Sequence, residues 1–285
     1  MTLAQSILAT LIYHDIFDYP LTDREIHHYL IGTRSNFSKV KSALSMLTNK
    51  RQVARSSDFY ALPKRNRLFK LRKQRDRFSS VKLKRAKIYA NILKVIPTVK
   101  LAAISGALAM QNSHKNDDID LVLITSSGSI WTTRFLANLL LWPFKRDPAG
   151  QKISNRACLN LFLDEAHLTV KEQNLYTAHE IAQMKLIWNR ENTYQRLIKT
   201  NSWIKKYLPN WQASSEFLDH GSEKKKLSTT NPVLQTTEKF FRNFQLNYMK
   251  SKITTEKIEE GQLFFHPADT QEKVLKTFAR GSRTP

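Results

Sequence analysis

Two aspartates separated by one residue are the side chains of this sequence best placed to do chemistry. Asp118 and Asp120 begin an apolar run, and the alternation of a strand would direct both carboxylates to one face. Carboxylates this close repel each other unless a cation lies between them, and hard oxygen ligands of this kind suit Mg²⁺. The spacing therefore predicts a magnesium site formed by Asp118 and Asp120.

A glycine twelve residues before Asp118 extends the pattern. Because Gly106 lacks a side chain, the backbone there can approach a phosphate closely, and exposed amides at the start of a following helix favour negative charge. We therefore expect nucleotide-binding roles for Ser105, Gly106 and Ala107, and for Arg134 on a later helix. Such a site can hold a nucleoside triphosphate by its metal-bridged phosphates and align the α-phosphorus with an attacking hydroxyl.

The apolar pattern around this motif predicts the elements that position it. Compact apolar runs predict three strands, and the stretches between them have helical spacing. The strands are expected at residues 99–104, 119–124 and 158–163, and the helices at residues 107–112 and 129–141. This mixed order favours a small sheet domain with helices packed on it.

The glycine and the aspartate pair resemble the nucleotidyltransferase superfamily of DNA polymerase β, and in particular the minimal and antibiotic nucleotidyltransferases. The family pattern is Gly-Ser, a spacer, and then Asp-x-Asp on the next strand. The matching positions here are Gly106, Ala107, Asp118 and Asp120. The wider run, with residues 108–110, 117–121, 131–134 and 176–180, is similar to a bacterial group that joins an N-terminal winged helix to this core.

The resemblance also implies a third carboxylate on a later strand. The candidate strand offers Asn160 in its middle and Asp164 at its end. Asparagine is a weaker ligand and cannot act as a base, so Asp164 is the expected third catalytic acid beside Asp118 and Asp120. The family's serine after the glycine is Ala107 in this chain, and Ser105 is the candidate to replace it.

Residues 1–63 show three short helical patterns followed by a two-stranded hairpin. Thr22 and Glu25 form a capping box at the start of the second helix, and Gly32 is suited to end it. This order resembles the winged helix-turn-helix family, in which the third helix enters the major groove of DNA. That helix would present Ser38, Lys39, Lys41, Ser42 and Ser45, with Arg55 on the wing. DNA binding and protein contact are equal alternatives for such a module.

The charge balance indicates a polyanionic partner. The chain has 46 Lys and Arg against 24 Asp and Glu, for a net charge of +22. Residues 64–87 carry twelve basic side chains and one acid within a predicted connector helix over residues 64–96. Nucleic acid is therefore an expected partner through residues 35–87, and a solvated helix face is the alternative interpretation.

Other features bound the setting and the remainder of the chain. Cys158 is the one cysteine, and the chain starts without an apolar leader, which together favour the cytoplasm. The most apolar stretch, residues 135–144, is too short to cross a bilayer, so no membrane partner is expected. Residues 171–285 have mostly helical spacing, with a linker expected over residues 212–232.

The expected fold class is α+β in four parts. These are a winged helix-turn-helix over residues 1–63, a basic connector helix over 64–96, a mixed-sheet nucleotidyltransferase core over 97–170 and a helical C-terminal region over 171–285.

Two functions follow, and they belong to different classes. The first is Mg²⁺-dependent transfer of a nucleoside monophosphate from a nucleoside triphosphate to an acceptor hydroxyl. The second is a catalytically weak or inactive regulator that senses nucleotide and binds nucleic acid, which Ala107 and the end position of Asp164 favour. The place of Asp164 relative to the aspartate pair discriminates between the two.

Overall fold

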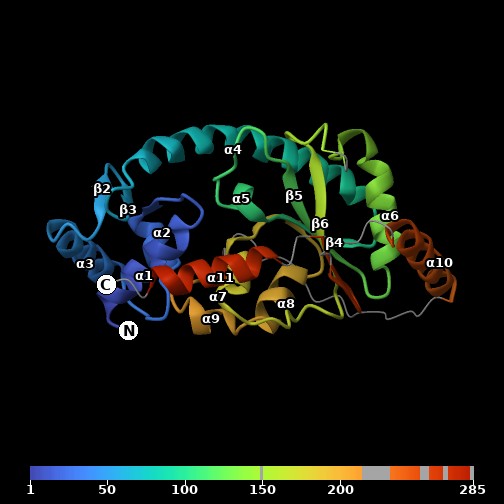
Figure 1. Ribbon diagram of the computed structural model, residues 1–285. Coiled ribbons are helices and arrows are strands. Elements are labelled where there is room, and N and C mark those ends of the chain that lie inside the picture. Colours follow the sequence, from blue (N-terminus) through green and yellow to red (C-terminus); the bar gives the residue numbers. More distant parts are fainter. Residues whose placement is uncertain (148–149, 214–231, 251–256, 266–268, 283–285) are drawn as a thin grey trace.

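The computed structural model describes residues 1–147, 150–213, 232–250, 257–265 and 269–282 (Figure 1). Within them, helices alternate with the strands of one three-stranded and one six-stranded sheet. The mixed helix and strand content and the mixed larger sheet agree with the α+β class. Most of the linker expected over residues 212–232 lies outside the described residues.

The N-terminal unit consists of three helices and a small antiparallel sheet. Thr22 and Glu25 form the predicted capping box, and the side chain of Asn36 caps the third helix. A short strand that the sequence pattern did not predict pairs with the hairpin. The elements are α1 (Leu3–Asp15), β1 (Leu21–Thr22), α2 (Asp23–His28), α3 (Phe37–Asn49), β2 (Ala54–Ser56) and β3 (Phe59–Ala61).

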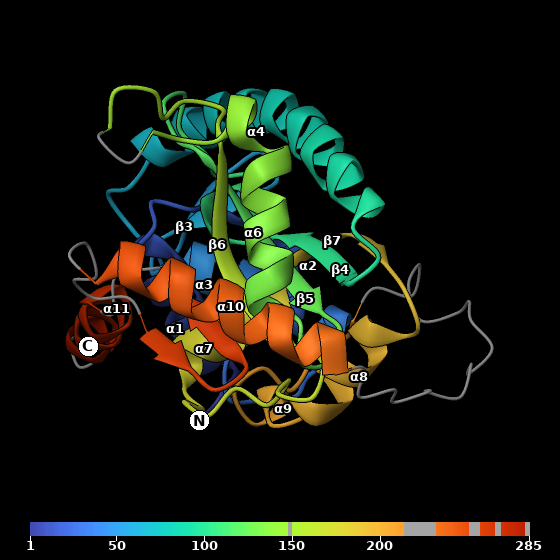
Figure 2. The ribbon, with the colours of Figure 1, turned by 90° about the vertical axis from the view of Figure 1, so that its right-hand side faces the viewer.

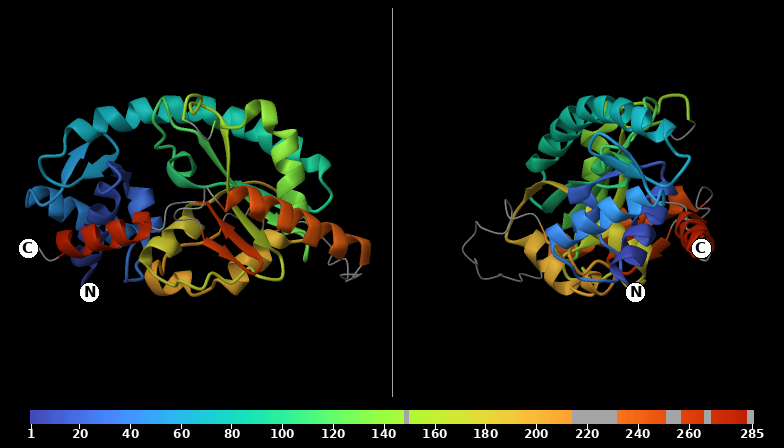
Figure 3. Two further views of the ribbon diagram at one scale, coloured as in Figure 1. Left: turned by 45° about the vertical axis from the view of Figure 1, so that its right-hand side comes forward. Right: turned by 90° about the vertical axis from the view of Figure 1, so that its left-hand side faces the viewer.

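A single long helix, α4 (Arg67–Ile92), connects this unit to the larger sheet and ends in a 3₁₀ turn, η1 (Leu93–Val95). It arches over one side of the molecule in Figure 1, and the views of Figure 3 show the N-terminal helices at one end of it. Its last turns pack on the sheet through Ala86, Tyr89 and Ala90. The predicted connector helix is confirmed, with slightly narrower bounds.

The basic side chains of α4 fall into two groups. Arg72, Arg75 and Lys82 are buried and face inward, where Arg72 lies over the ring of Tyr19 at 3.8 Å and forms an ion pair with Glu25 at 3.0 Å. The other group is exposed on the outer face of the helix or just before it. It comprises Lys64, Arg67, Lys70, Lys73, Arg77, Lys84, Arg85 and Lys87. Part of the basic run is therefore structural. The prediction of a polyanion-binding run over residues 64–87 does not separate these buried side chains from the exposed ones.

The larger sheet has the strand order β7-β4-β5-β6-β9-β8. The three central strands lie where the apolar runs predicted them: β4 (Val99–Ile104), β5 (Ile119–Thr125) and β6 (Ala157–Asp164). β4 is antiparallel to β5, and β5 is parallel to β6. Between them lie the short helix α5 (Gly106–Ala109), α6 (Ile130–Leu140) and the 3₁₀ turn η2 (Trp142–Phe144).

Helices cover both faces of this sheet. On one face, Leu121 and Leu123 pack with residues of α4 and α6. On the other, Val122 and Ile124 pack with Leu197 of α8 (Thr193–Thr200). The remaining helices are α7 (Leu175–Gln183), α9 (Ile204–Tyr207), α10 (Pro232–Met249) and α11 (Asp269–Gly281). Figure 2 shows α10 lying across α6, where the carboxylate of Glu238 accepts hydrogen bonds from the first amides of α6.

The expected helical C-terminal region also contains strands, and this corrects the prediction. The strand β7 (Lys185–Asn189) pairs with β4, and the hairpin of β8 (Lys257–Glu259) and β9 (Gln262–Phe264) pairs with β6. Each strand has five residues or fewer, which is too short for an alternating pattern to stand out. They form because the two edges of the central sheet need backbone partners.

Among the residues that the structure describes, no helix combines the length and the apolar character that crossing a bilayer requires.

A cluster of buried rings joins α1 to α7. The ring of Tyr13 stacks on that of His179 with centroids 3.9 Å apart, and His14 packs edge-on against His179 at 5.3 Å. Burial lowers the pKa of His14 to about 4 and that of His179 well below its usual value. Both imidazoles are therefore neutral in the folded protein near neutral pH.

This cluster predicts a loss of stability in acid. Between pH 6.5 and 4 the unfolded chain binds a proton at His14 that the folded chain does not, so the free energy of unfolding falls as the pH falls. From this residue alone we expect a loss of about 2 kcal/mol between pH 7 and pH 5. Urea denaturation of the wild type and of His14→Asn, which can still donate to the Thr10 carbonyl, measures the difference. Parallel pH profiles for the two proteins would contradict the assignment.

Candidate metal and nucleotide site

The site lies at the end of the sheet where β4 finishes and β5 and β6 begin. The amide of Ser105 donates to the carbonyl of Asp120 at 3.1 Å, which extends the pairing of β4 and β5 one residue past the end of β4, at the start of β5. Gly106 then adopts φ +63, and a Cβ built there would lie 3.0 Å from Oδ2 of Asp120. The glycine turn and the carboxylate are therefore in contact, and the turn requires glycine both for its backbone angle and for space.

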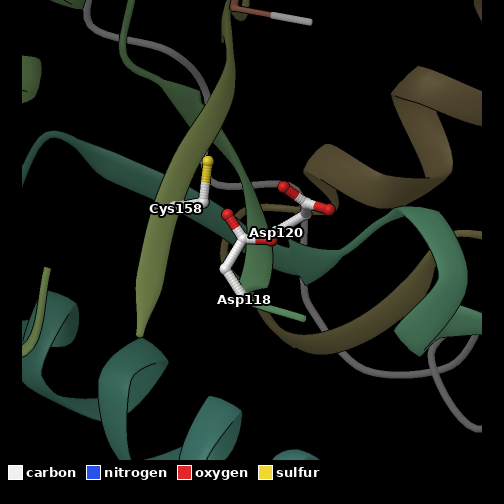
Figure 4. A group of neighbouring side chains, drawn as sticks. All are labelled: Asp118, Asp120 and Cys158. Carbon is white, nitrogen blue, oxygen red and sulfur yellow. The ribbon is translucent and has the colours of Figure 1, made fainter. Parts of the chain in front are cut away.

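Three side chains meet beside this turn. One ligand atom from each of Asp118, Asp120 and Cys158 lies within 4.8 Å of the others. Figure 4 shows the two carboxylates at the start of β5 and the thiol on neighbouring β6. The parallel register pairs Asp120 with Cys158, so both side chains point to the same face of the sheet. The predicted pairing of Asp118 and Asp120 is thus present in the structure, with a thiol as its third member.

The loop before β5 is fixed by its own hydrogen bonds. Asp117 accepts a hydrogen bond from the amide of His114 at 2.7 Å, and its carbonyl accepts one from the buried ammonium of Lys82. Asp118 pairs with Arg146, whose Nη1 lies 2.8 Å from Oδ2. Asp117 is therefore a structural acid, and Asp118 is the one that faces a cation beside the cluster.

The electrostatics of the cluster favour binding of positive charge. Burial, followed by the charge of Asp118, raises the pKa of Asp120 to about 7. Burial and the same carboxylate of Asp120 raise the pKa of the Cys158 thiol, which is consequently protonated near neutral pH and hydrogen-bonds to Asp120. A cation between the carboxylates would relieve their repulsion and stabilise the charged form of both.

Helix α7 supplies a further carboxyl group close to the cluster. Burial, followed by the charge of Asp120, raises the pKa of Glu180 to about 7. The hydroxyl of Tyr176, one turn earlier, also has its pKa raised by burial and by nearby charges that include Asp120. A carboxyl group with a pKa near 7 can accept a proton at neutral pH, which is a property of general bases.

Asp164 does not join the aspartate pair. Its Oδ2 accepts from the amide of Gly128 at 2.6 Å, and its Oδ1 accepts from the amide of Ala166 at 2.8 Å. In the strand register Asp164 pairs with Thr125, six residues along β6 from Cys158, which corresponds to about 20 Å. The expected role as third catalytic acid is corrected, because Asp164 organises the loops at the opposite end of the strands.

One of the expected nucleotide-binding residues also takes another place. Arg134 hydrogen-bonds to Gln245 on α10 and lies over the ring of Phe265 at 4.6 Å, so its contacts are with the C-terminal elements. Burial lowers its pKa to about 10. Ala107 is exposed at the start of α5, beside the glycine. Of the expected set, the structure brings together Ser105, Gly106, Ala107, Asp118 and Asp120.

Sequence reasoning missed Cys158, Arg146 and Glu180 as members of the site. The local pattern indicates only that Cys158 packs within a strand, and the pairing of β5 with β6 is what places it opposite Asp120. Arg146 lies in a loop without periodicity. Glu180 lies in the stretch at residues 176–180. The resemblance of that stretch to the bacterial group is the one feature of the sequence that could have indicated Glu180 as a member of the site.

The donor atoms fit a hard divalent cation. Mg²⁺ is commonly held by one or two carboxylates with substrate phosphates and water completing its shell, and Asp118 and Asp120 supply the carboxylates. The protonated thiol of Cys158 adds no hard ligand. The cluster therefore matches Mg²⁺ held partly by a ligand better than a closed protein cage.

Comparison with known proteins gives no assignment: no protein-family model, no curated protein and no solved structure matches this chain. The site has to be interpreted from its own geometry.

The glycine turn gives a testable prediction with a matched control. Gly106 and Gly128 both have positive φ, at +63 and +65, so alanine costs about 1 kcal/mol at either position through backbone strain. Only at position 106 does the added methyl group meet a carboxylate, since nothing lies within 4 Å at position 128. We expect a larger loss of unfolding free energy for Gly106→Ala than for Gly128→Ala in urea denaturation. Equal losses would show that the close approach to Asp120 is unimportant.

Proposed function

We propose that this protein is a nucleotidyltransferase, which binds a nucleoside triphosphate with Mg²⁺ and transfers the nucleoside monophosphate to an acceptor hydroxyl. The observation that carries the proposal is the contact between the Gly106 turn and the carboxylate of Asp120, which clusters with that of Asp118. A backbone turn without a side chain leaves room for phosphate oxygens, and the carboxylates can hold the cation that phosphates bring with them.

Each residue of the site has a defined role in this proposal. Asp118 and Asp120 would hold the cation, which when bound would supply positive charge to the phosphates and to the leaving pyrophosphate. Arg146 has a side chain 48% exposed and lies against the acids, so its guanidinium can contact a phosphate oxygen. Glu180 takes the proton of the attacking hydroxyl, since its carboxyl group interacts electrostatically with Asp120 and its pKa is about 7.

The likeness to polymerase β-type nucleotidyltransferases supports the proposal through the order of elements. A strand, a glycine turn, a short helix and a second strand starting with the aspartate pair occur here as β4, Gly106, α5 and β5. The N-terminal helices and hairpin have the order of a winged helix-turn-helix, and we propose that architecture for residues 1–63. Ala107, and Cys158 in place of a third acid, are departures from the family pattern.

Transfer of label from α-³²P nucleoside triphosphates, in the presence of Mg²⁺, tests the activity. We expect Asp118→Asn and Asp120→Asn each to reduce the rate by at least a hundredfold, because the phosphates lose the cation that orients and neutralises them. Asp76→Asn, which removes an exposed acid on α4, is the control and should leave the rate unchanged. Indistinguishable rates for the wild type and both site variants would exclude the proposed enzyme.

A second candidate function is a nucleotide-sensing regulator that binds nucleic acid. Two observations favour it: Asp164 points away from the aspartate pair, and the outer face of α4 exposes a row of basic side chains. Arg55 and the polar side chains of α3, including Lys39 and Lys41, are exposed as well. These surfaces together could follow a nucleic-acid backbone.

Charge reversal on α4 tests this second candidate. The triple variant Lys70→Glu, Lys73→Glu and Arg77→Glu should weaken binding to duplex DNA or RNA and reduce the slope of log affinity against log salt, by up to about 0.9 for each phosphate that the protein no longer neutralises. The control reverses three exposed lysines elsewhere, Lys199, Lys205 and Lys206, and so changes the net charge equally. If both triple variants lose affinity to the same degree, binding reflects net charge and α4 is not a specific surface.

A further inference from the structure

A cavity of about 170 Å³ lies on the face of the sheet that carries the aspartate pair. Its walls come from the sheet, from α7 and from the C-terminal hairpin. Most of the surface that lines it is apolar, with Val122, Ile181 and Phe264 among the contributors, and charged residues such as Glu172 and Lys257 line it as well. Apolar cavities of about 150 Å³ stay dry and bind molecules as large as benzene. The space is therefore large enough for a small organic group.

Two polar atoms in the wall of this cavity have no partner among the described residues. They are Oγ of Ser105 and Oδ1 of Asn160, on side chains of residues only 7% and 3% exposed. A buried polar atom without a hydrogen bond costs about 1–3 kcal/mol, so native proteins seldom retain one without a use. Both residues line the same cavity, and an occupant whose hydrogen-bonding group reached these two atoms would satisfy them.

The cavity adjoins the candidate site. Ser105 precedes the Gly106 turn, and Tyr176 and Glu180, which interact electrostatically with Asp120, also line the cavity. At the other side, the ion pair between Lys171 and Glu259, at 2.7 Å, links the loop before α7 to the hairpin. A molecule in the cavity would therefore lie beside Ser105, next to the Gly106 turn, at one end and against the C-terminal hairpin at the other.

We propose that this cavity is a binding site for a compact, largely apolar group that donates a hydrogen bond, oriented by the amide oxygen of Asn160 and the hydroxyl of Ser105. The apolar walls select the body of the ligand, and the two polar atoms select its orientation. Such a group could come from the nucleobase of the nucleotide or from a separate small acceptor that carries the attacking hydroxyl. The assignment to either source rests on the proposed function, whereas the cavity and its unpartnered atoms do not.

Indole and indene provide a matched pair of probes, because they share a shape and only indole has an N–H donor. Ligand-observed NMR titration of the full chain, without nucleotide or metal, should show indole binding about fivefold more tightly than indene, the ratio that one net hydrogen bond supports. Asn160→Leu should fold normally, because it removes a buried amide oxygen that has no partner and puts an apolar group of similar size in its place, and it should abolish the preference for indole. Met184→Trp, which fills the cavity from its partly buried wall, should abolish binding of both probes.

Competition with adenosine, guanosine, cytidine and uridine then identifies the source of the natural group. Displacement of indole by one of these nucleosides supports the binding site and assigns it to the nucleobase. Failure of all four nucleosides to displace bound indole also supports the binding site, and assigns it to a separate acceptor. Absence of indole binding to the wild type, or binding that both variants leave unchanged, would overturn the proposal. Because the probes carry no phosphate and need no metal, these outcomes do not depend on whether nucleotidyl transfer occurs.

Discussion

The contact between the Gly106 turn and the carboxylate of Asp120 is the constraint on which the site depends. The hydrogen bond from Ser105 to the carbonyl of Asp120 fixes the two backbones, and the positive φ of Gly106 then brings the turn against Oδ2. This arrangement holds a partly buried carboxylate beside that of Asp118, an energetically unfavourable placement that a bound cation would relieve. Stability and the proposed cation binding are thus opposed at this point, as is common in functional sites.

The long helix α4 contributes to that constraint as well as connecting two parts of the chain. Lys82 donates to the carbonyls of Lys115 and Asp117, and Arg75 donates to Asn112 and to carbonyls at the end of α1. Buried cations that donate to several acceptors hold loops more rigidly than exposed ion pairs do. The loop that precedes Asp118 is therefore held by the same helix that connects to the N-terminal unit. Basic side chains on one face of α4 pack against the rest of the protein, and those on the other face are exposed to solvent.

Local patterns predicted the elements of this fold well, and pairings between distant segments account for what they missed. The capping box at Thr22 and Glu25 and the three central strands follow from neighbouring residues, and the structure places them as expected. The position of Cys158 opposite Asp120 depends on the register between parallel strands, which no local pattern encodes. Asp164 was the expected third acid because it lies on β6, the strand next to the one that carries the aspartate pair. A strand moves a side chain about 3.3 Å further with each residue, so the six residues from Cys158 to Asp164 place Asp164 out of reach of the pair.

The thiol opposite Asp120 bears on whether the site transfers a nucleotide or only binds one. Holding a nucleotide requires the paired carboxylates, the turn and the cation that the phosphates share, and none of these involves the third position. Transfer additionally requires a group that accepts the proton of the attacking hydroxyl, and a thiol whose pKa is raised is already protonated and cannot do so. Glu180 could meet that requirement from a different element, because burial near Asp120 brings its pKa to about 7. With a thiol as the third member of the cluster, the proposed transfer requires that the acceptor lie between the sheet and α7, on the side where Ser105 and Asn160 have unpartnered atoms.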